Sequence, residues 1–197
     1  MRLLHISDTH CQHTSLMLPE ADIIVHSGDF TFGGSEQEAK DFFDWFCKLP
    51  YRHKVVVAGN HDCCLYDANL DTLPDDVHYL CGTSCVIEGL YFHGIPLFME
   101  DVLDGNLLRM YFEIPPETDI LVTHEPPYGF CDLWRNRHAG NRALANAIDA
   151  LPNLRYHLFG HQHDAYGTAI NGKVLFANAA LVDSKYNLKF SPKFFEV

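Results

Sequence analysis

The chain has 197 residues, of which 47% are hydrophobic, so it is long enough and apolar enough to bury a core, and this excludes a disordered protein. Its 26 acidic and 14 basic residues give a formal net charge of −12. No cluster of Lys or Arg is evident that could follow a long polyanionic backbone, so no long nucleic acid is expected as a partner.

Short apolar runs rich in β-branched residues recur along the chain, and each stops at a polar motif. Continuous apolar runs of this length are typical of strands that are buried on both faces, as in an α/β sheet. In such sheets ligands collect beyond the carboxyl ends of the strands, which is where all five motifs lie. The predicted strands are residues 3–6, 23–25, 55–57, 120–122 and 156–159.

Helices are predicted in two of the intervals. Ser35 followed by Glu38 matches a capping box, and apolar residues then recur at helical spacing as far as Pro50. A second amphipathic pattern predicts a helix over residues 141–151, with Pro152 as the stop.

Two antiparallel hairpins complete the prediction. Residues 85–92 hold two short apolar runs around Glu88-Gly89, and residues 168–176 hold two around Asn171-Gly172. No internal repeat or linker divides the sequence, so we expect a single domain over residues 1–197.

The seven cysteines are odd in number and contain no C-x-x-C pair, which argues against a disulfide framework and against a zinc ribbon. The amino terminus does not show a basic segment followed by an apolar stretch, and no uninterrupted apolar run reaches about 18 residues. We therefore expect reduced thiols, no membrane association and a cytoplasmic location.

The five polar motifs carry the side chains that bind metal ions. They supply two Asp, one Asn and four His ligands, with one further His beside them. No single helix or loop could hold residues spread over this length, so the fold must gather them. A mixed oxygen and nitrogen set of this size suits a pair of divalent cations that hydrolyses a phosphate ester. The motif residues are Asp8 and His10; Asp29; Asn60, His61 and Asp62; His124; and His161 and His163.

These five motifs, in this order, resemble the signature of the calcineurin-like metallophosphoesterase superfamily, and the resemblance covers essentially the whole chain. Residues 21–31, 49–51, 123–130 and 159–167 are further similar to the small metallophosphoesterase-domain proteins related to cyclic nucleotide phosphodiesterases. The resemblance implies an α/β fold, a four-layer sandwich of two packed mixed β-sheets flanked by helices, with a dinuclear metal site at one edge.

The resemblance also implies a ligand set in which Asp29 bridges two metals. A carboxylate suits this role because it offers two oxygens and a negative charge between cations that lie about 3.5 to 4 Å apart. Mn, Fe, Zn, Co and Ni are all compatible with these donors, and we favour Mn. One metal is assigned to Asp8, His10, Asp29 and His163, and the other to Asp29, Asn60, His124 and His161.

Catalysis is expected to start from a water that the two metals share, which would lose a proton near neutral pH and attack phosphorus. His61 is not a ligand in the family pattern, and its imidazolium could stabilise the transition state or protonate the departing oxygen. Asp62 resembles the acidic residue that orients this imidazole and raises its basicity. An acidic residue at a helix start also serves as a cap, so that interpretation stays open.

The similarity to the cyclic nucleotide branch implies a phosphodiesterase that acts on small diesters. A nucleotide phosphomonoesterase needs the same centre and is the alternative, and a non-catalytic metal-binding scaffold is a remote third. Two divalent cations would add +4 to the charge of −12 and leave −8, which favours a small phosphoester or nucleotide over a large nucleic acid. The oligomeric state is left open.

The residues that bind the rest of the substrate are not determined by the motifs. Phe32, Tyr128 and Phe130 follow metal motifs and could stack on a base, or could equally pack in the core. The basic residues between 135 and 142 lead into a helix start that could hold an anion, with solvated surface charge as the alternative. His13 could contact a phosphate or could be structural.

Overall fold

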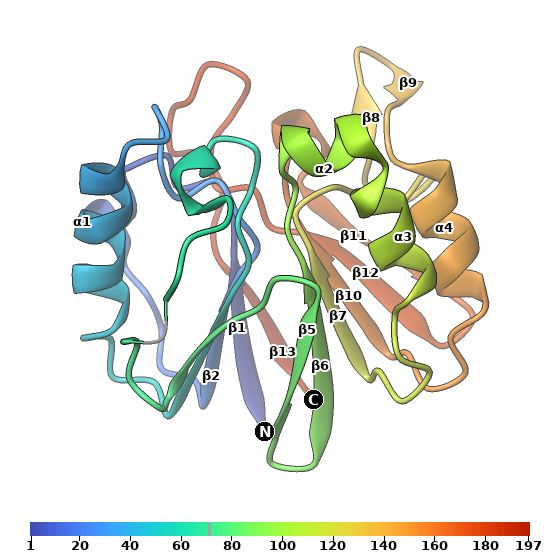
Figure 1. Ribbon diagram of the computed structural model, residues 1–197, viewed down its shortest axis with the longest axis horizontal. Coiled ribbons are helices and arrows are strands. Elements are labelled where there is room, and N and C mark those ends of the chain that lie inside the picture. Colours follow the sequence, from blue (N-terminus) through green and yellow to red (C-terminus); the bar gives the residue numbers. More distant parts are fainter. Residues whose placement is uncertain (71) are drawn as a thin grey trace.

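The computed structural model describes residues 1–70 and 72–197 and shows two mixed β-sheets packed face to face, with helices on the two outer faces (Figure 1). The first sheet has five strands in the order β13-β1-β2-β3-β4, and the second has six in the order β11-β12-β10-β7-β6-β5. The α/β four-layer sandwich that the resemblance implied is confirmed. The strands of the first sheet are β1 (Arg2–Ile6), β2 (Ile23–His26), β3 (His53–Val56), β4 (Val77–Tyr79) and β13 (Lys193–Glu196). Those of the second are β5 (Thr83–Ile87), β6 (Leu90–Ile95), β7 (Ile120–Thr123), β10 (Tyr156–Phe159), β11 (Gly167–Asn171) and β12 (Val174–Asn178).

Both sheets are parallel in the middle and antiparallel at an edge. Strands β1 to β4 run parallel, and β13 pairs antiparallel with β1. Strands β12, β10, β7 and β6 also run parallel, with β11 and β5 antiparallel at the two edges. The carboxyl ends of the parallel strands carry the polar motifs, so this pairing brings the motifs of each sheet to one end of that sheet.

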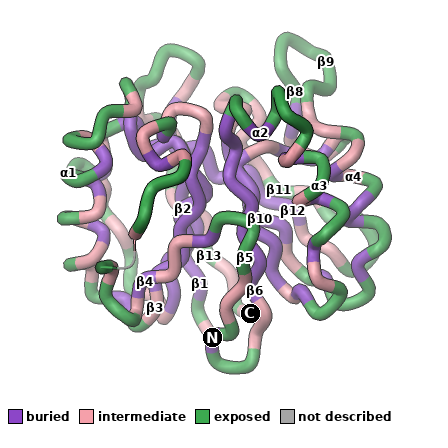
Figure 2. Tube along the Cα trace, in the orientation of Figure 1, coloured by how far each residue is buried: buried purple, intermediate pink, exposed green. Residues whose placement is uncertain are grey.

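Alternate residues of the central strands face different cores, which explains why these strands carry apolar residues on both faces. In β2, Ile23 and Val25 pack between the two sheets, whereas Ile24 packs on the outer face against α1. In β7, Val122 packs between the sheets and Leu121 packs against the outer helices. Figure 2 shows the resulting buried interior along the strands and the exposed outer sides of the helices.

Both predicted helices form. Helix α1 (Glu36–Phe46) begins with the capping box of Ser35 and Glu38 and ends at Phe46, a few residues before Pro50. Helix α4 (Arg142–Asp149) begins at Asn141, whose side chain accepts hydrogen bonds from the backbone N–H groups of Ala143 and Leu144. Both predicted hairpins are also present, as β5–β6 and β11–β12.

Several elements were not predicted from the sequence. They are the strands β4 and β13, the helices α2 (Met99–Asp104) and α3 (Asn106–Phe112), and a small separate hairpin of β8 (Leu133–Trp134) and β9 (Arg137–His138). Short 3₁₀ turns follow three of the polar motifs, at His13–Ser15, Cys63–Leu65 and His163–Ala165. None of the helices formed by the described residues is both long enough and apolar enough to span a membrane.

Candidate metal centre

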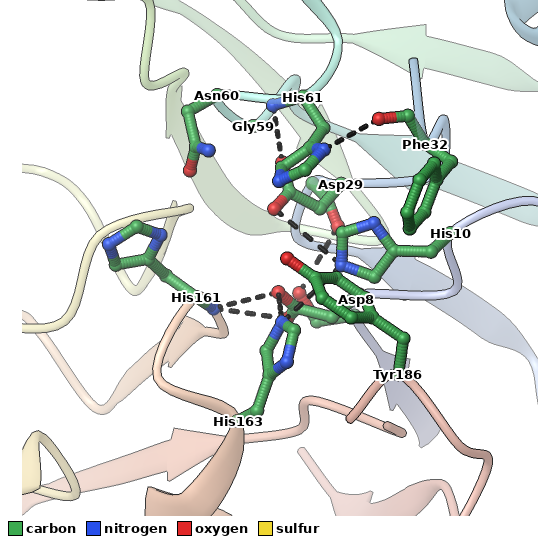
Figure 3. Close-up of polar contacts among 12 residues, drawn as sticks. Asp8, His10, Asp29, Phe32, Gly59, Asn60, His61, His161, His163 and Tyr186 are labelled. Carbon is green, nitrogen blue, oxygen red and sulfur yellow. Dashed lines mark hydrogen bonds and ion pairs between the residues drawn. The ribbon is translucent and has the colours of Figure 1, made fainter. Parts of the chain in front are cut away.

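The five polar motifs meet at one edge of the molecule, beyond the carboxyl ends of strands from both sheets. Their donor atoms form three overlapping groups, and within each group the atoms lie within 4.8 Å of one another. His10 and Asp29 each belong to two groups, so the three make one cluster (Figure 3). The groups are Asp8, His10 and His163; His10, Asp29 and His61; and Asp29, His124 and His161.

One side of the cluster combines residues from both ends of the chain. The Nε2 atom of His163 lies 3.2 Å from Oδ1 of Asp8 and 3.3 Å from Nε2 of His10. The same atom of His10 lies 3.8 Å from Oδ2 of Asp29. These four side chains are the set predicted for the first metal.

The other side of the cluster shares Asp29. Its Oδ2 lies 3.3 Å from Nε2 of His124, and that nitrogen is 3.2 Å from Oδ1 of Asn60. His161 completes this group, and its backbone N–H donates to the Asp8 carboxylate at 3.0 Å. Asp29 therefore lies between the two predicted ligand sets, which is the position that a bridging carboxylate requires.

Four of the predicted ligands adopt a left-handed backbone conformation, which is uncommon outside glycine. The φ angles are +53° for Asp8, +40° for His10, +57° for Asp29 and +67° for His161. Each turns the chain sharply just after a strand, so that the side chain faces the cluster. Strain concentrated in this way is typical of functional sites.

Two glycines make room for the carboxylates. A Cβ atom on Gly59 would lie 2.2 Å from Oδ1 of Asp29, and one on Gly160 would lie 2.1 Å from Oδ2 of Asp8. Real Cβ atoms essentially never approach other atoms this closely. The glycine that precedes Asn60 and the one that precedes His161 are therefore required by the close packing of the cluster.

Backbone carbonyl groups fix the orientation of the imidazole rings. The Nδ1–H groups of His10, His124 and His163 donate to carbonyl oxygens at 3.0, 2.8 and 3.1 Å respectively. This directs each Nε2 into the cluster, where a neutral ring offers its lone pair to a metal, the arrangement typical of metal-binding histidines. The accepting carbonyls belong to Thr31, Ser27 and Asp183.

The charges of the buried carboxylates need a nearby cation. Burial alone would raise the pKa of Asp8, but the hydrogen bond from His163 and the neighbouring positive charges hold it well below its ordinary value. Burial would likewise lower the pKa of His124, but the Asp29 carboxylate raises it to about 10. Burial lowers the pKa of His161 to about 4, so that its ring is neutral and able to bind a metal. Two buried carboxylates surrounded by oriented imidazoles and an amide oxygen fit divalent cations well.

His61 belongs to the second of the three groups of donor atoms without being one of the predicted ligands, and its ring centroid lies 4.8 Å from that of His10. Its Nδ1–H donates to the carbonyl of Phe32 at 2.7 Å, and its backbone N–H donates to Oδ1 of Asp29 at 2.8 Å. The imidazole is therefore oriented by a backbone carbonyl, and its Nε2 is the atom left for other contacts.

The expected role of Asp62 in orienting that imidazole is wrong. Its buried carboxylate accepts hydrogen bonds from the backbone N–H groups of Asp29, Gly59 and Thr31 at 2.8 to 2.9 Å, and from the Thr31 hydroxyl. It does not cap the following 3₁₀ turn with its side chain either. Asp62 instead ties the loop after β2 to the loop after β3, so its effect on His61 is indirect.

Comparison with known proteins agrees with this geometry. The calcineurin-like phosphoesterase family matches residues 1–165. A UPF0046 protein of Caenorhabditis elegans is 31% identical over 227 residues, which covers 100% of this chain and 81% of that protein. The human metallophosphoesterase domain-containing protein 1 is 30% identical over 220 residues, covering 94% of this chain and 67% of that protein. The chain belongs to the calcineurin-like phosphoesterase family. It is therefore a metal-dependent phosphoric ester hydrolase, as the five motifs predicted.

A more distant relative is a 3′,5′-cyclic-nucleotide phosphodiesterase of Nostoc. It is 22% identical over 160 residues, covering 75% of this chain and 58% of that protein. Part of the chain is thus similar to a protein that is named for a small cyclic diester.

The structure also shows residues at the centre that the sequence did not indicate. A cleft of about 300 Å³ opens over the cluster. Tyr186 lies directly over two of the predicted ligands, with its ring 4.8 Å from that of His10 and 5.2 Å from that of His163 (Figure 3). It belongs to the loop between β12 and β13, beyond the part of the chain that the family matches, and no motif surrounds it. The cleft is lined by Asp29, Asn60, His61, Trp134, His161, Gln162, His163, Asp164, Ser184 and Tyr186.

Of the three aromatic residues considered for stacking on a base, Phe32 is the one whose ring is still available. Phe130 stacks on Phe176 at 4.1 Å in the core, and Tyr128 lies under the guanidinium of Arg142 at 3.6 Å. Phe32 is exposed and lies 5.2 Å from Tyr186 at the edge of the centre.

Two other candidates lose support. His13 is buried against Trp45 and Phe42 of α1, so it does not contact a phosphate in the cleft. At the start of α4, the Asn141 side chain already occupies two of the N–H groups that were considered for an anion.

Proposed function

We propose that this phosphoesterase hydrolyses small phosphodiesters of the cyclic nucleotide type at a centre of two divalent metals. The observation that carries the proposal is the gathering of all seven predicted ligands, six in the cluster of donor atoms and Asn60 against His124, with Asp29 between the two sets. The small volume of the cleft and the net charge of −12 favour a small substrate over a long polyanion.

The chain supplies a complete set of groups for this reaction. The ligands would be Asp8, His10, Asp29 and His163 for one metal, and Asp29, Asn60, His124 and His161 for the other. Divalent metals bound there supply Lewis acidity and lower the pKa of bound water. We favour Mn among the metals that suit mixed oxygen and nitrogen donors.

His61 is proposed as the proton donor to the leaving oxygen. Because its Nδ1–H already donates to the carbonyl of Phe32, Nε2 is the atom able to hand over a proton. Its backbone N–H donates to Asp29, the proposed bridging ligand, and this fixes the position of its Cα atom relative to the centre. The ring is thus held from two sides, which is the preorganisation that proton transfer requires.

The distant similarity to a 3′,5′-cyclic-nucleotide phosphodiesterase supports the diester over the monoester. The seven cysteines are all free thiols, which supports a reducing compartment and hence a cytoplasmic location.

The proposal is tested first by elemental analysis of the protein as isolated, with two metals per chain expected. Activity is then measured with added Mn on bis(p-nitrophenyl) phosphate, p-nitrophenyl phosphate and the 2′,3′- and 3′,5′-cyclic isomers of AMP. We expect the diesters to have the higher kcat/KM. Faster hydrolysis of the monoester would establish the phosphomonoesterase alternative, and metal-loaded protein without any turnover would establish the scaffold.

A further inference from the structure

The hairpin β8–β9 lies next to the metal centre but contributes no predicted ligand. It forms a separate two-stranded sheet beside the six-stranded one and stands at the same end of the molecule as the site (Figure 1). Strand β8 contacts the 3₁₀ turn His163–Ala165, so the hairpin adjoins a segment that begins with a metal ligand. Its position is therefore coupled to the centre.

A buried carboxylate holds the base of the hairpin in place. Asp132 accepts hydrogen bonds from the backbone N–H groups of Gly129 and Gly140, both at 3.0 Å, and from Nδ1 of His138 at 2.6 Å. These bonds join the two ends of the hairpin. The side chains that it carries are thus presented on a fixed support.

Trp134 is the large apolar side chain that this support presents to the cleft. It lines the same cavity as Asn60, His61 and His161, and 52% of its surface is exposed. The guanidinium of Arg135 lies 4.5 Å above one face of its ring. The position of this large apolar side chain is therefore not explained by packing in the protein interior. Its exposed surface lines the cavity that contains predicted ligands.

The turn of the hairpin has a strained backbone that places Arg135 over Trp134. Arg135 and Asn136 have φ angles of +47° and +62°, as a type I′ turn requires. Asn tolerates this conformation well, but Arg does so rarely. The consequence of placing Arg in the turn is a cation over one face of the Trp134 ring, and strained residues of this kind concentrate where a ligand is bound.

The charges on the hairpin point to an anionic ligand. In the described part of the chain, Arg2, Arg52 and Arg109 each form an ion pair with a carboxylate. Arg135 and Arg137 are exposed and form no such pair among these residues, although the chain has 26 acidic residues. The positive charge of this hairpin beside an acidic centre raises the local concentration of a negatively charged small molecule.

We propose that Trp134 is the residue that recognises the group esterified to the phosphate, and that this group is a nucleobase-like planar ring that stacks on the indole. This rests on the proposed function, because the phosphate must lie at the metal cluster for the attached ring to reach Trp134. Indole surfaces accept any nucleobase by stacking, so the residue selects nucleoside phosphates over phosphoesters without a ring and does not select one base.

The kinetic test compares Trp134→Ala with the wild type on 3′,5′-cyclic AMP and on glycerophosphocholine, a diester that has no aromatic ring. We expect kcat/KM for cyclic AMP to fall roughly 5- to 100-fold, mainly through KM, with little change for the ring-free diester. Trp134→Phe should recover most of the loss. Phe112→Ala is the matched control, because Phe112 is 67% exposed on α3 and does not line the cleft. Equal losses on both substrates, or none on cyclic AMP, would overturn the proposal.

A binding test gives a second measurement that does not depend on turnover. The chain has two tryptophans, so Trp45→Phe leaves Trp134 as the single indole fluorophore. Titration with AMP should quench its emission to saturation, and ribose 5-phosphate should not. AMP that inhibits hydrolysis without quenching would contradict the stacking. If cyclic AMP and the other esters are not hydrolysed but AMP still quenches, the proposed function fails while the binding site stands.

Discussion

The two sheets hold their parts of the metal centre in different ways. On the five-stranded side, the loops after β2 and β3 are joined through the carboxylate of Asp62, which accepts hydrogen bonds from Asp29, Thr31 and Gly59 inside the protein. On the six-stranded side, the loop after β10 reaches Asp8 through the backbone N–H of His161.

The loops on the two sides of the centre also differ in their surroundings. Half-exposed aromatic residues, Trp134 and Tyr186, lie beside the loop after β10. The groups that need a fixed geometry for chemistry are thus set in a buried network, whereas the side chains that can meet the substrate lie on exposed loops. The following predictions test this division from the largest expected effect to the smallest.

The largest effect is expected for Asp29→Ala, which removes the carboxylate shared by both ligand sets. We expect the loss of metal at both positions and a fall in kcat/KM of roughly 1,000-fold or more, because neither set is complete without it. Metal content by elemental analysis, together with the diester assay, measures both consequences. Asp41→Ala, an exposed acidic residue on α1, is the control. If Asp29→Ala retained two metals per chain, Asp29 would not be the bridge.

His61→Ala separates catalysis from metal binding on the same buried side. We expect full metal occupancy with turnover reduced roughly 100- to 10,000-fold, the range for loss of a general acid. The measurement pairs kcat with metal content, and His53→Ala is a control for the removal of a histidine outside the cluster. Because a donor atom of His61 lies within 4.8 Å of those of His10 and Asp29, loss of metal would show instead that it is a ligand. An unchanged rate would remove it from the mechanism.

Asp62→Asn tests whether the buried network holds the ligands. The amide has one acceptor oxygen in place of two, so at least one of the N–H groups of Asp29, Gly59 and Thr31 loses its partner. We expect the free energy of unfolding to fall by about 2 to 4 kcal/mol and metal affinity to weaken roughly 10- to 100-fold. Denaturant unfolding and metal titration measure the two effects. A variant with unchanged stability and metal binding but an altered pH profile of kcat would restore the direct role on His61 that the sequence suggested.

Much of the architecture could be predicted because it depends on local sequence patterns. The strands that lead to the motifs carry apolar residues on both faces since both of their faces are buried, and the capping box of Ser35 and Glu38 marks the start of α1 from two residues alone. Hairpin turns such as Asn171-Gly172 are equally local. The topology of the two sheets came only from the resemblance.

The parts that could not be predicted depend on contacts between distant residues. Asp62 precedes a helical turn, which suggested a cap, and the resemblance suggested an imidazole partner. Its carboxylate instead accepts from Asp29 and Thr31 of a different loop, as well as from Gly59 of its own. Tyr186 has no neighbouring motif, and Trp134 belongs to a hairpin of two-residue strands that is too short to leave a periodic pattern. Residues of this kind are recognised as part of the site only when the fold brings them to it.

The smallest expected effect is on stability and concerns two buried histidines, His26 of β2 and His157 of β10. His26 in the first sheet accepts the N–H of Gly28 and donates to Thr9, so both ring nitrogens are satisfied. His157 in the second sheet contacts the Thr123 hydroxyl at 2.8 Å through Nε2, and its buried Nδ1 has no partner. Since that hydroxyl already donates to the carbonyl of Glu125, Nε2 of His157 carries the proton and Nδ1 is bare.

Protonation of His157 in the folded state is therefore unfavourable, and burial lowers its pKa to about 3. The unfolded chain takes up a proton near pH 6.5, so stability is fully present above that pH and is lost as the pH falls toward the folded pKa. Between pH 7.5 and pH 5, we expect the free energy of unfolding of the wild type to fall by about 1 to 2 kcal/mol more than that of His157→Phe, which cannot titrate. Urea unfolding of both proteins at the two pH values measures the difference. At pH 7.5, His157→Phe should lower the free energy of unfolding by less than His26→Phe does, because it removes one hydrogen bond and His26→Phe removes two. The reverse order would contradict the view that the first sheet holds the more tightly bonded part of the centre.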